Sequence, residues 1–346
     1  LNMCGASVDR RTAHIQGDEG NTGMRTSIRI ATLFITLAAS CAYTSAHAKW
    51  PERPMRLVVP FVPGAGGDLT GRLVAQQLSD ALGQQAVVDN RPGAGSIIGT
   101  ELVAKSAPDG YTILIATAAL TYIPGMYSKL GYDTLKDLTG VSLVWHAPFV
   151  LVVRPQFPAQ TVPDLVKMAR AKPGEILYSS AGQATAVHLA TALFAYTTKT
   201  QLTQVPYKGG GQAVVALLAN EVALMFATPE TLLTFIRDGR LRAVAVTSRE
   251  RAAVLPSVPT MVENGYKDYE HTAWFGVLVP AGTPKEIVTT LNRIITKGMT
   301  TPEMRERYAQ VGSTIIAGTP EQFNKFIRDE IVRWGGIIKE AGIKLD

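Results

Sequence analysis

The sequence predicts an α/β protein built of two lobes. From Pro51 onward, short apolar runs typical of strands alternate with amphipathic runs typical of helices. The apolar runs are continuous, which is expected of parallel strands covered on both faces. A second series of the same kind begins after His146-Ala147-Pro148. Two such series favour two sheets, each with helices on its faces.

The first series predicts three strands and two helices. We expect strands at 55–61, 85–88 and 111–116, and helices at 68–82 and 98–106. The leucines of 68–82 recur at helical spacing and fall mostly on one face. The turn Pro108-Asp109-Gly110 precedes the third strand.

The second series and the tail continue this alternation. We expect strands at 149–153, 176–180, 202–205, 222–226, 241–247 and 274–280. Helices are expected at 162–171, 184–198, 212–219, 230–238, 284–298, 302–311 and 320–341. Thr161 is the expected N-cap of helix 162–171. The three tail helices begin with Pro, which is favoured at a first helical position.

The chain is expected to cross between the lobes at 144–148. A second crossing falls near 271–276 if the tail returns to the first lobe. Two crossings make a hinge, and a ligand would then sit in the cleft between the lobes.

Residues 1–48 have the pattern of processing sequence. A charged segment at 24–29 precedes an apolar run too short to span a bilayer, and Ala46-His47-Ala48 fits a cleavage site. We predict a Sec-type signal peptide cleaved after Ala48, with Met24 as the true start. The alternative is a lipoprotein modified at Cys41, but Ala38 fits the lipoprotein pattern poorly.

Cleavage after Ala48 would remove both cysteines, so neither disulfides nor thiolate chemistry are expected. It would also remove four Arg and three acidic residues, which leaves a net charge of +5. The basic residues are spread along the chain without a basic, aromatic face, which argues against nucleic-acid binding. A mild positive balance suits an anionic ligand.

Two glycine-rich loops, at 60–68 and 90–100, each lie between an expected strand and an expected helix. Glycine lets backbone N–H groups approach a ligand closely, and a helix start favours negative charge. The N–H groups of Gly64, Ala65, Gly66 and Gly67 are therefore expected ligand contacts. Asp68 fits the N-cap of the following helix, with direct ligand contact by its side chain as the alternative.

The glycine spacing of the second loop does not fit a nucleotide site. Gly93, Gly95 and Gly99 are one residue off the dinucleotide fingerprint, and the next strand does not end in an acidic residue. Neither loop is followed by Lys-Ser or Lys-Thr, so a P-loop is excluded.

A third helix start lies in the second lobe, at 178–189. Ser180 and Thr185 could donate hydroxyl hydrogen bonds to an anion, and Thr185 could equally be structural. His188 is interpreted first as a satisfied core residue and second as a ligand contact.

The sequence offers little for catalysis. Only His146, His188 and His271 remain after cleavage, and neither a metal-binding histidine motif nor a G-x-S-x-G elbow is present. No cofactor or metal is expected. An exported α/β oxidoreductase or hydrolase stays as the alternative to a binding protein.

Several segments together resemble one family, the substrate-binding proteins of tripartite tricarboxylate transporters, or Bug-type periplasmic receptors. From about Lys49 to Asp346 the matching stretches occur in order, at 50–61, 64–68, 90–95, 108–112, 205–210, 255–260, 274–276 and 280–284. The resemblance implies a two-lobed type II periplasmic-binding-protein fold. The implied boundaries are lobe 1 at 49–147 and 275–346, and lobe 2 at 148–274.

The resemblance also implies a function and a site. It implies a periplasmic, non-catalytic receptor for a small organic di- or tricarboxylate, acting as a monomer with a two-subunit membrane permease. A sensing subunit for a membrane signalling protein would use the same binding chemistry. The implied ligand-binding residues are Gly64, Ala65, Gly66, Gly67, Asp68, Gly95, Ser96, Thr117, Ala118, Ser180, Gly182, Thr185, His188 and Thr228.

This chain departs from the family pattern at three places. The family usually has Gly where Ala65 stands and a hydroxyl residue where Gly67 stands. It usually has Asp after Met-Phe, where this chain has Ala227-Thr228. Since that Asp can select ligands with an amine or hydroxyl group, its absence argues against an amino-acid ligand.

Overall fold

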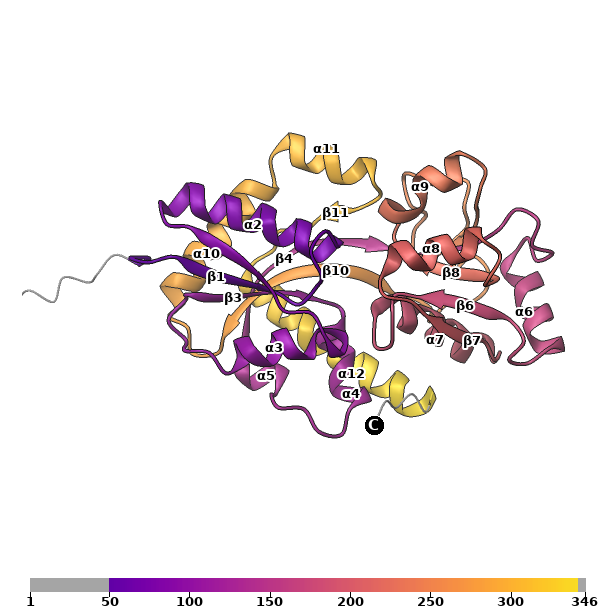
Figure 1. The fold of residues 1–346 in the computed structure, drawn as a ribbon, viewed down its shortest axis with the longest axis horizontal. Helices are drawn as coiled ribbons and strands as arrows, with labels where there is room; N and C mark the ends of the chain where they lie inside the picture. Colours follow the sequence, from indigo (N-terminus) through magenta and orange to yellow (C-terminus); the bar gives the residue numbers. More distant parts are fainter. Residues whose placement is uncertain (1–49, 342–346) are drawn as a thin grey trace, which may run out of the picture. The chain divides into compact units, whose positions relative to one another are not determined.

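A computed structural model describes residues 50–341 of the chain, which contain two sheets joined by two passages of the backbone (Figure 1). Residues 51–341 pack as one compact unit. The predicted signal peptide, its cleavage site and Cys41 lie outside the described residues. The predicted α/β class with two sheets is confirmed.

The first sheet has six strands in the order β11-β4-β10-β3-β1-β2. Their bounds are β1 Met55–Val59, β2 Ala86–Asn90, β3 Thr112–Thr117, β4 Leu138–Pro148, β10 Thr272–Pro280 and β11 Thr314–Ile315. β1 runs parallel to both β2 and β3, whereas β10 runs antiparallel to β3 and β4. The accompanying helices are α2 Gly66–Leu82, η1 Ala94–Ser96, α3 Ile97–Ala104, α4 Ala119–Met126, α5 Thr134–Asp137, α10 Lys285–Met299, α11 Pro302–Gln310 and α12 Pro320–Ala341.

The second sheet has five strands in the order β7-β6-β8-β5-β9. Their bounds are β5 Val150–Val153, β6 Leu177–Ser180, β7 Thr203–Pro206, β8 Leu224–Ala227 and β9 Arg242–Val246. β6 runs parallel to β7 and β8, and β5 runs antiparallel to β8 and β9. The helices of this half are α6 Val162–Ala171, α7 Ala186–Thr198, α8 Gly210–Leu218 and α9 Pro229–Arg237.

The two passages between the sheets lie side by side. A single residue, Phe149, separates β4 from β5, and the chain returns from β9 to β10 through residues 247–271. The Phe149 N–H donates to Thr247 Oγ1 at 2.7 Å, and the His271 N–H donates to the Thr247 carbonyl at 3.3 Å. The fully buried His271 ring stacks on Phe149 and meets the edge of Trp334 in α12. One cluster therefore ties both passages to α12.

Elements with clear end signals match their expected bounds. α6 spans the expected residues, and its N-cap is confirmed because Thr161 accepts from the Asp164 N–H while Asp164 accepts from the Thr161 N–H. α12 also begins at the expected Pro320. None of the described helices has the length and apolar character needed to cross a membrane.

Elements without such signals were missed. α4 carries Pro124 in its interior and packs on α12, so tertiary contacts rather than helix propensity support it. β4 begins at Leu138, well before the expected crossing, and β11 has only two residues.

Candidate functional site

The loops with the predicted site residues follow the carboxyl ends of parallel strands. β1, β2 and β3 are parallel, so the segments after them, beginning at 60, 91 and 118, lie at one edge of the first sheet. β6, β7 and β8 are also parallel, so 181–185, 207–209 and 228 share one edge of the second sheet. Such edges are where open α/β sheets bind ligands.

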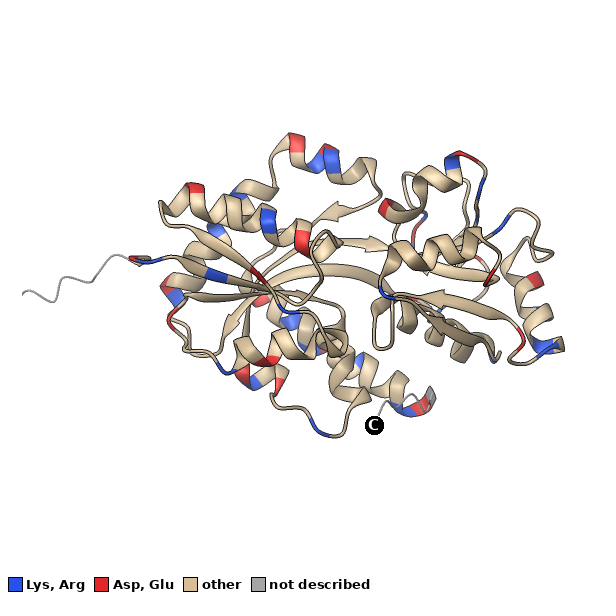
Figure 2. Ribbon diagram, viewed as in Figure 1, with Lys and Arg blue, Asp and Glu red and all other residues tan. Residues whose placement is uncertain are grey.

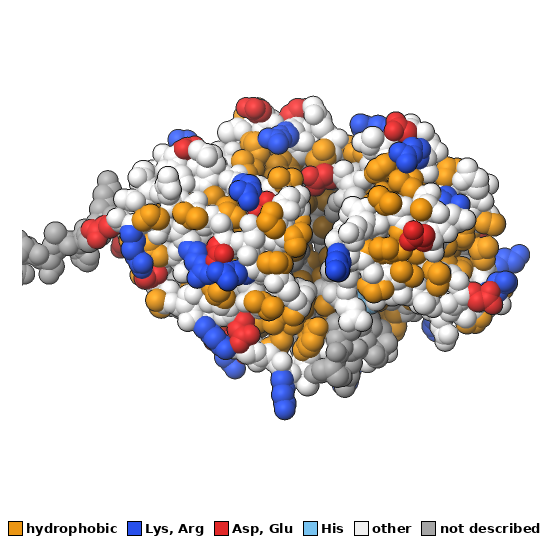
Figure 3. Space-filling view, in the orientation of Figure 1, with side chains coloured by type: hydrophobic (Ala, Val, Ile, Leu, Met, Phe, Trp, Pro, Cys, Tyr) orange, Lys and Arg blue, Asp and Glu red, His pale blue; other side chains and the backbone are white. Residues whose placement is uncertain are grey.

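The two edges face each other. A Cβ placed on Gly95, after β2, would lie 3.0 Å from Ala184 Cβ and 3.3 Å from its carbonyl oxygen. Ala184 belongs to residues 181–185 between β6 and α7, the third loop of the site. In the space-filling view a furrow runs between the two halves, with hydrophobic side chains on both sides (Figure 3). The structure therefore brings the second and third predicted loops together.

The first loop offers two free backbone donors. The Gly64 N–H donates to Asp68 Oδ2 at 2.9 Å, and the Ala65 N–H donates to the Val62 carbonyl at 3.2 Å. The N–H groups of Gly66 and Gly67, in the first turn of α2, have no acceptor among the described residues. Of the four expected contacts, only these two N–H groups are therefore left without an acceptor; Gly66 is exposed and Gly67 is buried.

Gly66 and Gly67 differ in their surroundings. A Cβ on Gly67 would lie 2.2 Å from the Phe61 ring, whereas a Cβ on Gly66 would meet nothing within 4 Å. Gly67 is thus needed for packing, and Gly66 faces open space. Ala65 is the N-cap residue with φ of −73°, an ordinary value for alanine, so the turn accommodates this departure from the family pattern.

The prediction that Asp68 is the N-cap is wrong, because α2 begins two residues earlier. Asp68 is only 2 % exposed, and its carboxylate accepts from Gly64, from Arg72 Nε at 2.9 Å and from Asn90 Nδ2 at 2.9 Å. Burial alone would raise the Asp68 pKa, but these hydrogen bonds hold it below its ordinary value. Its role is therefore to fasten the first loop.

The second loop is strained. Ala94, Gly95 and Ser96 all have positive φ, of 45°, 64° and 88°. Only glycine adopts this region without cost, and such strain tends to gather at functional sites. The Ser96 N–H is occupied by the Gly93 carbonyl, and Ser96 is buried.

The polar side chains of the third loop are bonded within the protein. Ser180 Oγ accepts from Gln204 Nε2 at 2.7 Å and from the Gly182 N–H at 3.2 Å. Thr185 is the N-cap of α7, accepting from the His188 N–H and donating to the Gly182 carbonyl. His188 Nδ1 accepts from the Ala184 N–H at 3.3 Å, and burial lowers the His188 pKa. These contacts match the structural interpretation of Thr185 and His188.

The remaining predicted residues border the same edges. Thr117, the last residue of β3, is half-buried, and Ala118, the N-cap of α4, is buried. Thr228 occupies the N-cap position of α9, but its hydroxyl lies 3.3 Å from Thr231 Oγ1 and caps no backbone N–H.

Sequence reasoning missed a fourth helix start at this site. Gly209 precedes α8 with φ of 111°, and a Cβ on Gly210 or Gly211 would meet nothing within 4 Å. This turn follows β7, at the same edge as the third loop. The signal was present in the sequence as Lys208 followed by three glycines.

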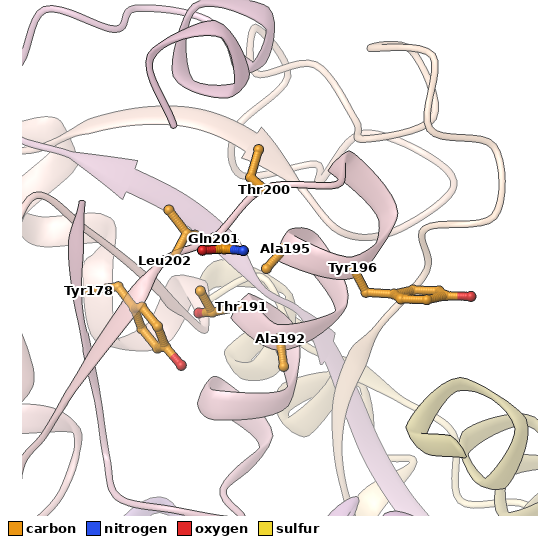
Figure 4. A pocket seen from close by; sticks show the side chains of 8 residues that line it. All are labelled: Tyr178, Thr191, Ala192, Ala195, Tyr196, Thr200, Gln201 and Leu202. Atoms are coloured by element: carbon orange, nitrogen blue, oxygen red, sulfur yellow. The ribbon is translucent and has the colours of Figure 1, made fainter. Parts of the chain in front are cut away.

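Other hollows and charges lie away from these loops. A cavity of about 330 Å³ is lined by Tyr178, Thr191, Ala192, Ala195, Tyr196, Thr200, Gln201 and Leu202, mainly from α7 and the segment after it (Figure 4). Charged residues are scattered, mostly over the outer helices (Figure 2). Within residues 50–341, His, Cys, Asp and Glu do not gather in threes that could hold a metal ion.

Comparisons with known proteins agree with one another. A sequence profile described as "Tripartite tricarboxylate transporter family receptor" matches residues 70–343. Protein BugT of Bordetella pertussis is 39 % identical over 320 residues, which is 92 % of this chain and 98 % of that protein. A solved R. palustris protein with adipate is 35 % identical with a TM-score of 0.78, covering 86 % of this chain and all of that one. MatC from Rhodopseudomonas palustris, with bound malate, is 28 % identical with a TM-score of 0.77, covering 84 % of this chain and all of that one.

Proposed function

Because the chain belongs to the family of tripartite tricarboxylate transporter receptors, we propose that it captures a small organic di- or tricarboxylate between its two sheets. The similar proteins solved with adipate and malate support this ligand class. The proposed receptor is periplasmic, is exported by the predicted signal peptide and is non-catalytic. It hands its ligand, as a monomer, to a two-subunit membrane permease.

The observation that carries the proposal is the pair of free N–H groups at Gly66 and Gly67. They lie in the first turn of α2, where the helix dipole favours an anion. The glycine-rich start of α8 and the first turn of α7 belong to the facing edge. Amides from both edges could grip the two ends of a dicarboxylate without a cationic side chain.

We propose the lobe boundaries implied by the resemblance. Lobe 1 would comprise residues 49–147 and 275–346, and lobe 2 residues 148–274. The predicted residues are proposed to form the site together, with direct backbone contact to the ligand by Gly66 and Gly67, and with Gly95 and Gly182 shaping the turns around it. Asp68, Thr185 and His188 are proposed to act by holding their loops rather than by touching the ligand.

Ligand identity can be tested directly. Mass spectrometry of small molecules released from the purified, denatured protein should detect a carboxylate. Calorimetric titration of the stripped protein with malate, adipate and citrate should then give saturable binding of at least one. If the stripped protein binds none of a broad panel of anionic metabolites, the carboxylate proposal is wrong.

The loop assignment has its own variant. Gly66→Leu should weaken binding at least about tenfold, by blocking the approach to the free amides, and should leave the melting temperature unchanged. Gly336→Leu is the matched control, because Gly336 also faces open space but lies in α12, away from the loops. Equal affinity in both variants would reject the assignment.

A further inference from the structure

Two glycines of the first-sheet half mark the places where a side chain would collide with the second-sheet half. The first is Gly95, with the close approach to Ala184 described above. Ala184 has φ of 52°, and its N–H is held by His188 Nδ1. The lobe-2 side of this contact is therefore fixed by hydrogen bonding and is poorly able to move aside.

The second is Gly312, between α11 and β11. A Cβ there would lie 2.7 Å from Val254 Cγ2 and 2.8 Å from Pro229 Cβ. Pro229 begins α9, and Val254 lies in the segment between β9 and β10. Real side chains do not approach this closely, so any residue other than glycine would have to displace Val254 and Pro229 of the second-sheet half.

We propose that Gly95 and Gly312 are the closure stops of the receptor, the two contacts that set how far the lobes can close on a ligand. This rests on the proposed function, since it assumes hinge closure around a ligand. Each stop is a left-handed glycine, with φ of 64° at Gly95 and 75° at Gly312, and each faces residues of lobe 2. His188 is a positioning residue in this scheme, because it fixes Ala184.

A larger residue at either stop should shift the population toward open lobes. Packed interfaces switch between discrete arrangements rather than deforming continuously. A larger side chain at one contact should therefore shift the hinge as a whole toward its open arrangement. Apparent ligand affinity falls with the fraction of closed protein, and a loss of about tenfold is expected for Gly95→Leu and Gly312→Leu. The free amides of Gly66 and Gly67 are untouched by both changes.

The chain supplies matched controls. Gly83 and Gly239 have φ of 69° and 68°, and a Cβ on either meets nothing within 4 Å. Gly83→Leu and Gly239→Leu therefore carry the same backbone strain without the contact. Each stop variant should lose affinity relative to its control at a similar melting temperature.

The lobe separation can be measured without a ligand. Nitroxide labels would be placed at Lys167→Cys in α6 and Lys297→Cys in α10, both exposed, in the full chain carrying Cys4→Ser and Cys41→Ser. Pulsed electron resonance should show longer distances in Gly95→Leu and Gly312→Leu than in the two controls. Distances that match the controls would overturn the proposal.

Two further measurements keep the test decisive. If a glycine variant fails to fold, Val254→Trp enlarges the second stop from lobe 2 without backbone strain, and it should give the same longer distances. Unchanged distances in a folded Val254→Trp would also overturn the stop at Gly312. Failure of the wild type to bind malate, adipate or citrate would refute the proposed function alone, because the distance shifts stand independently of it.

Discussion

The loop after β1 and the loop after β6 are both held in place by hydrogen bonds, but the side chains that form these bonds differ in charge. Both precede a helix, and in both the polar side chains expected to contact a ligand form hydrogen bonds within the protein instead. The first loop is fastened by a buried carboxylate paired with Arg72, the third by neutral hydroxyls and a neutral imidazole. In the first loop the Gly66 and Gly67 amides, rather than the side chains, stay free for an anion.

The difference matters for an anionic ligand. A negative charge beside the free amides of α2 would repel a carboxylate, but the ion pair with Arg72 and the hydrogen bonds from Gly64 and Asn90 offset it. The third loop carries no ionised group at all, provided that His188 stays neutral. The first loop should therefore be the more strongly fixed, and the third the more sensitive to acid.

The largest expected effect comes from breaking the first loop. Asp68→Ala would leave the Gly64 N–H and Arg72 Nε without this acceptor and would reduce Asn90 Nδ2 to its bond with the Phe61 carbonyl, so it should destabilise the protein by about 1–3 kcal/mol. Asp68→Asn keeps one acceptor oxygen and should lose less. Urea unfolding measures both, and a stability loss in Asp68→Ala no greater than in Asp68→Asn would contradict this account.

Lowering the pH should reduce the stability contributed by the third loop before it affects that of the first loop. The His188 pKa is lowered by burial from an ordinary value of 6.5, so the folded state resists a proton that the unfolded chain accepts. Stability is therefore full above pH 6.5 and falls as pH drops toward the folded pKa, by at most about 1.4 kcal/mol per pH unit. The Asp68 pKa is lowered from 3.8, so its contribution persists above that pH and is lost only below it.

Between these two limits the third loop should weaken, whereas the first loop should not. His188→Asn keeps an acceptor for the Ala184 N–H but cannot titrate, so its stability should fall less steeply with acid than that of the wild type. The remaining slope comes from other buried histidines, chiefly His271, whose pKa burial lowers to about 3. Identical slopes for wild type and His188→Asn, measured by urea unfolding across this range, would show that His188 does not carry the effect.

The sequence predicted backbone placement better than side-chain roles. Periodicity and end signals located both sheets, and Thr161 was recognised because its capping partner is three residues away. The bonding of Asp68 to Asn90 and of Ser180 to Gln204 spans more than twenty residues, so no local pattern shows it. The facing of Gly95 and Ala184 depends on how two sheets meet, which periodicity does not encode. Asp68 is not the N-cap because α2 begins at Gly66, which puts Ala65, a residue without a capping side chain, in the N-cap position.

The smallest expected effect comes from removing Thr185, the N-cap that helps to hold the third loop. Thr185→Ala removes the acceptor for the His188 N–H and should cost about 1 kcal/mol, the usual worth of an N-cap. Thr161→Ala is the control, since it removes an N-cap of the same residue type from α6, outside the loops of the site. Both should lower stability similarly in urea, but only Thr185→Ala should also weaken ligand binding, because it frees the start of α7 and the Ala184 turn. If the two variants bind malate, adipate or citrate equally well, the third loop owes its shape to Ser180 and His188 instead.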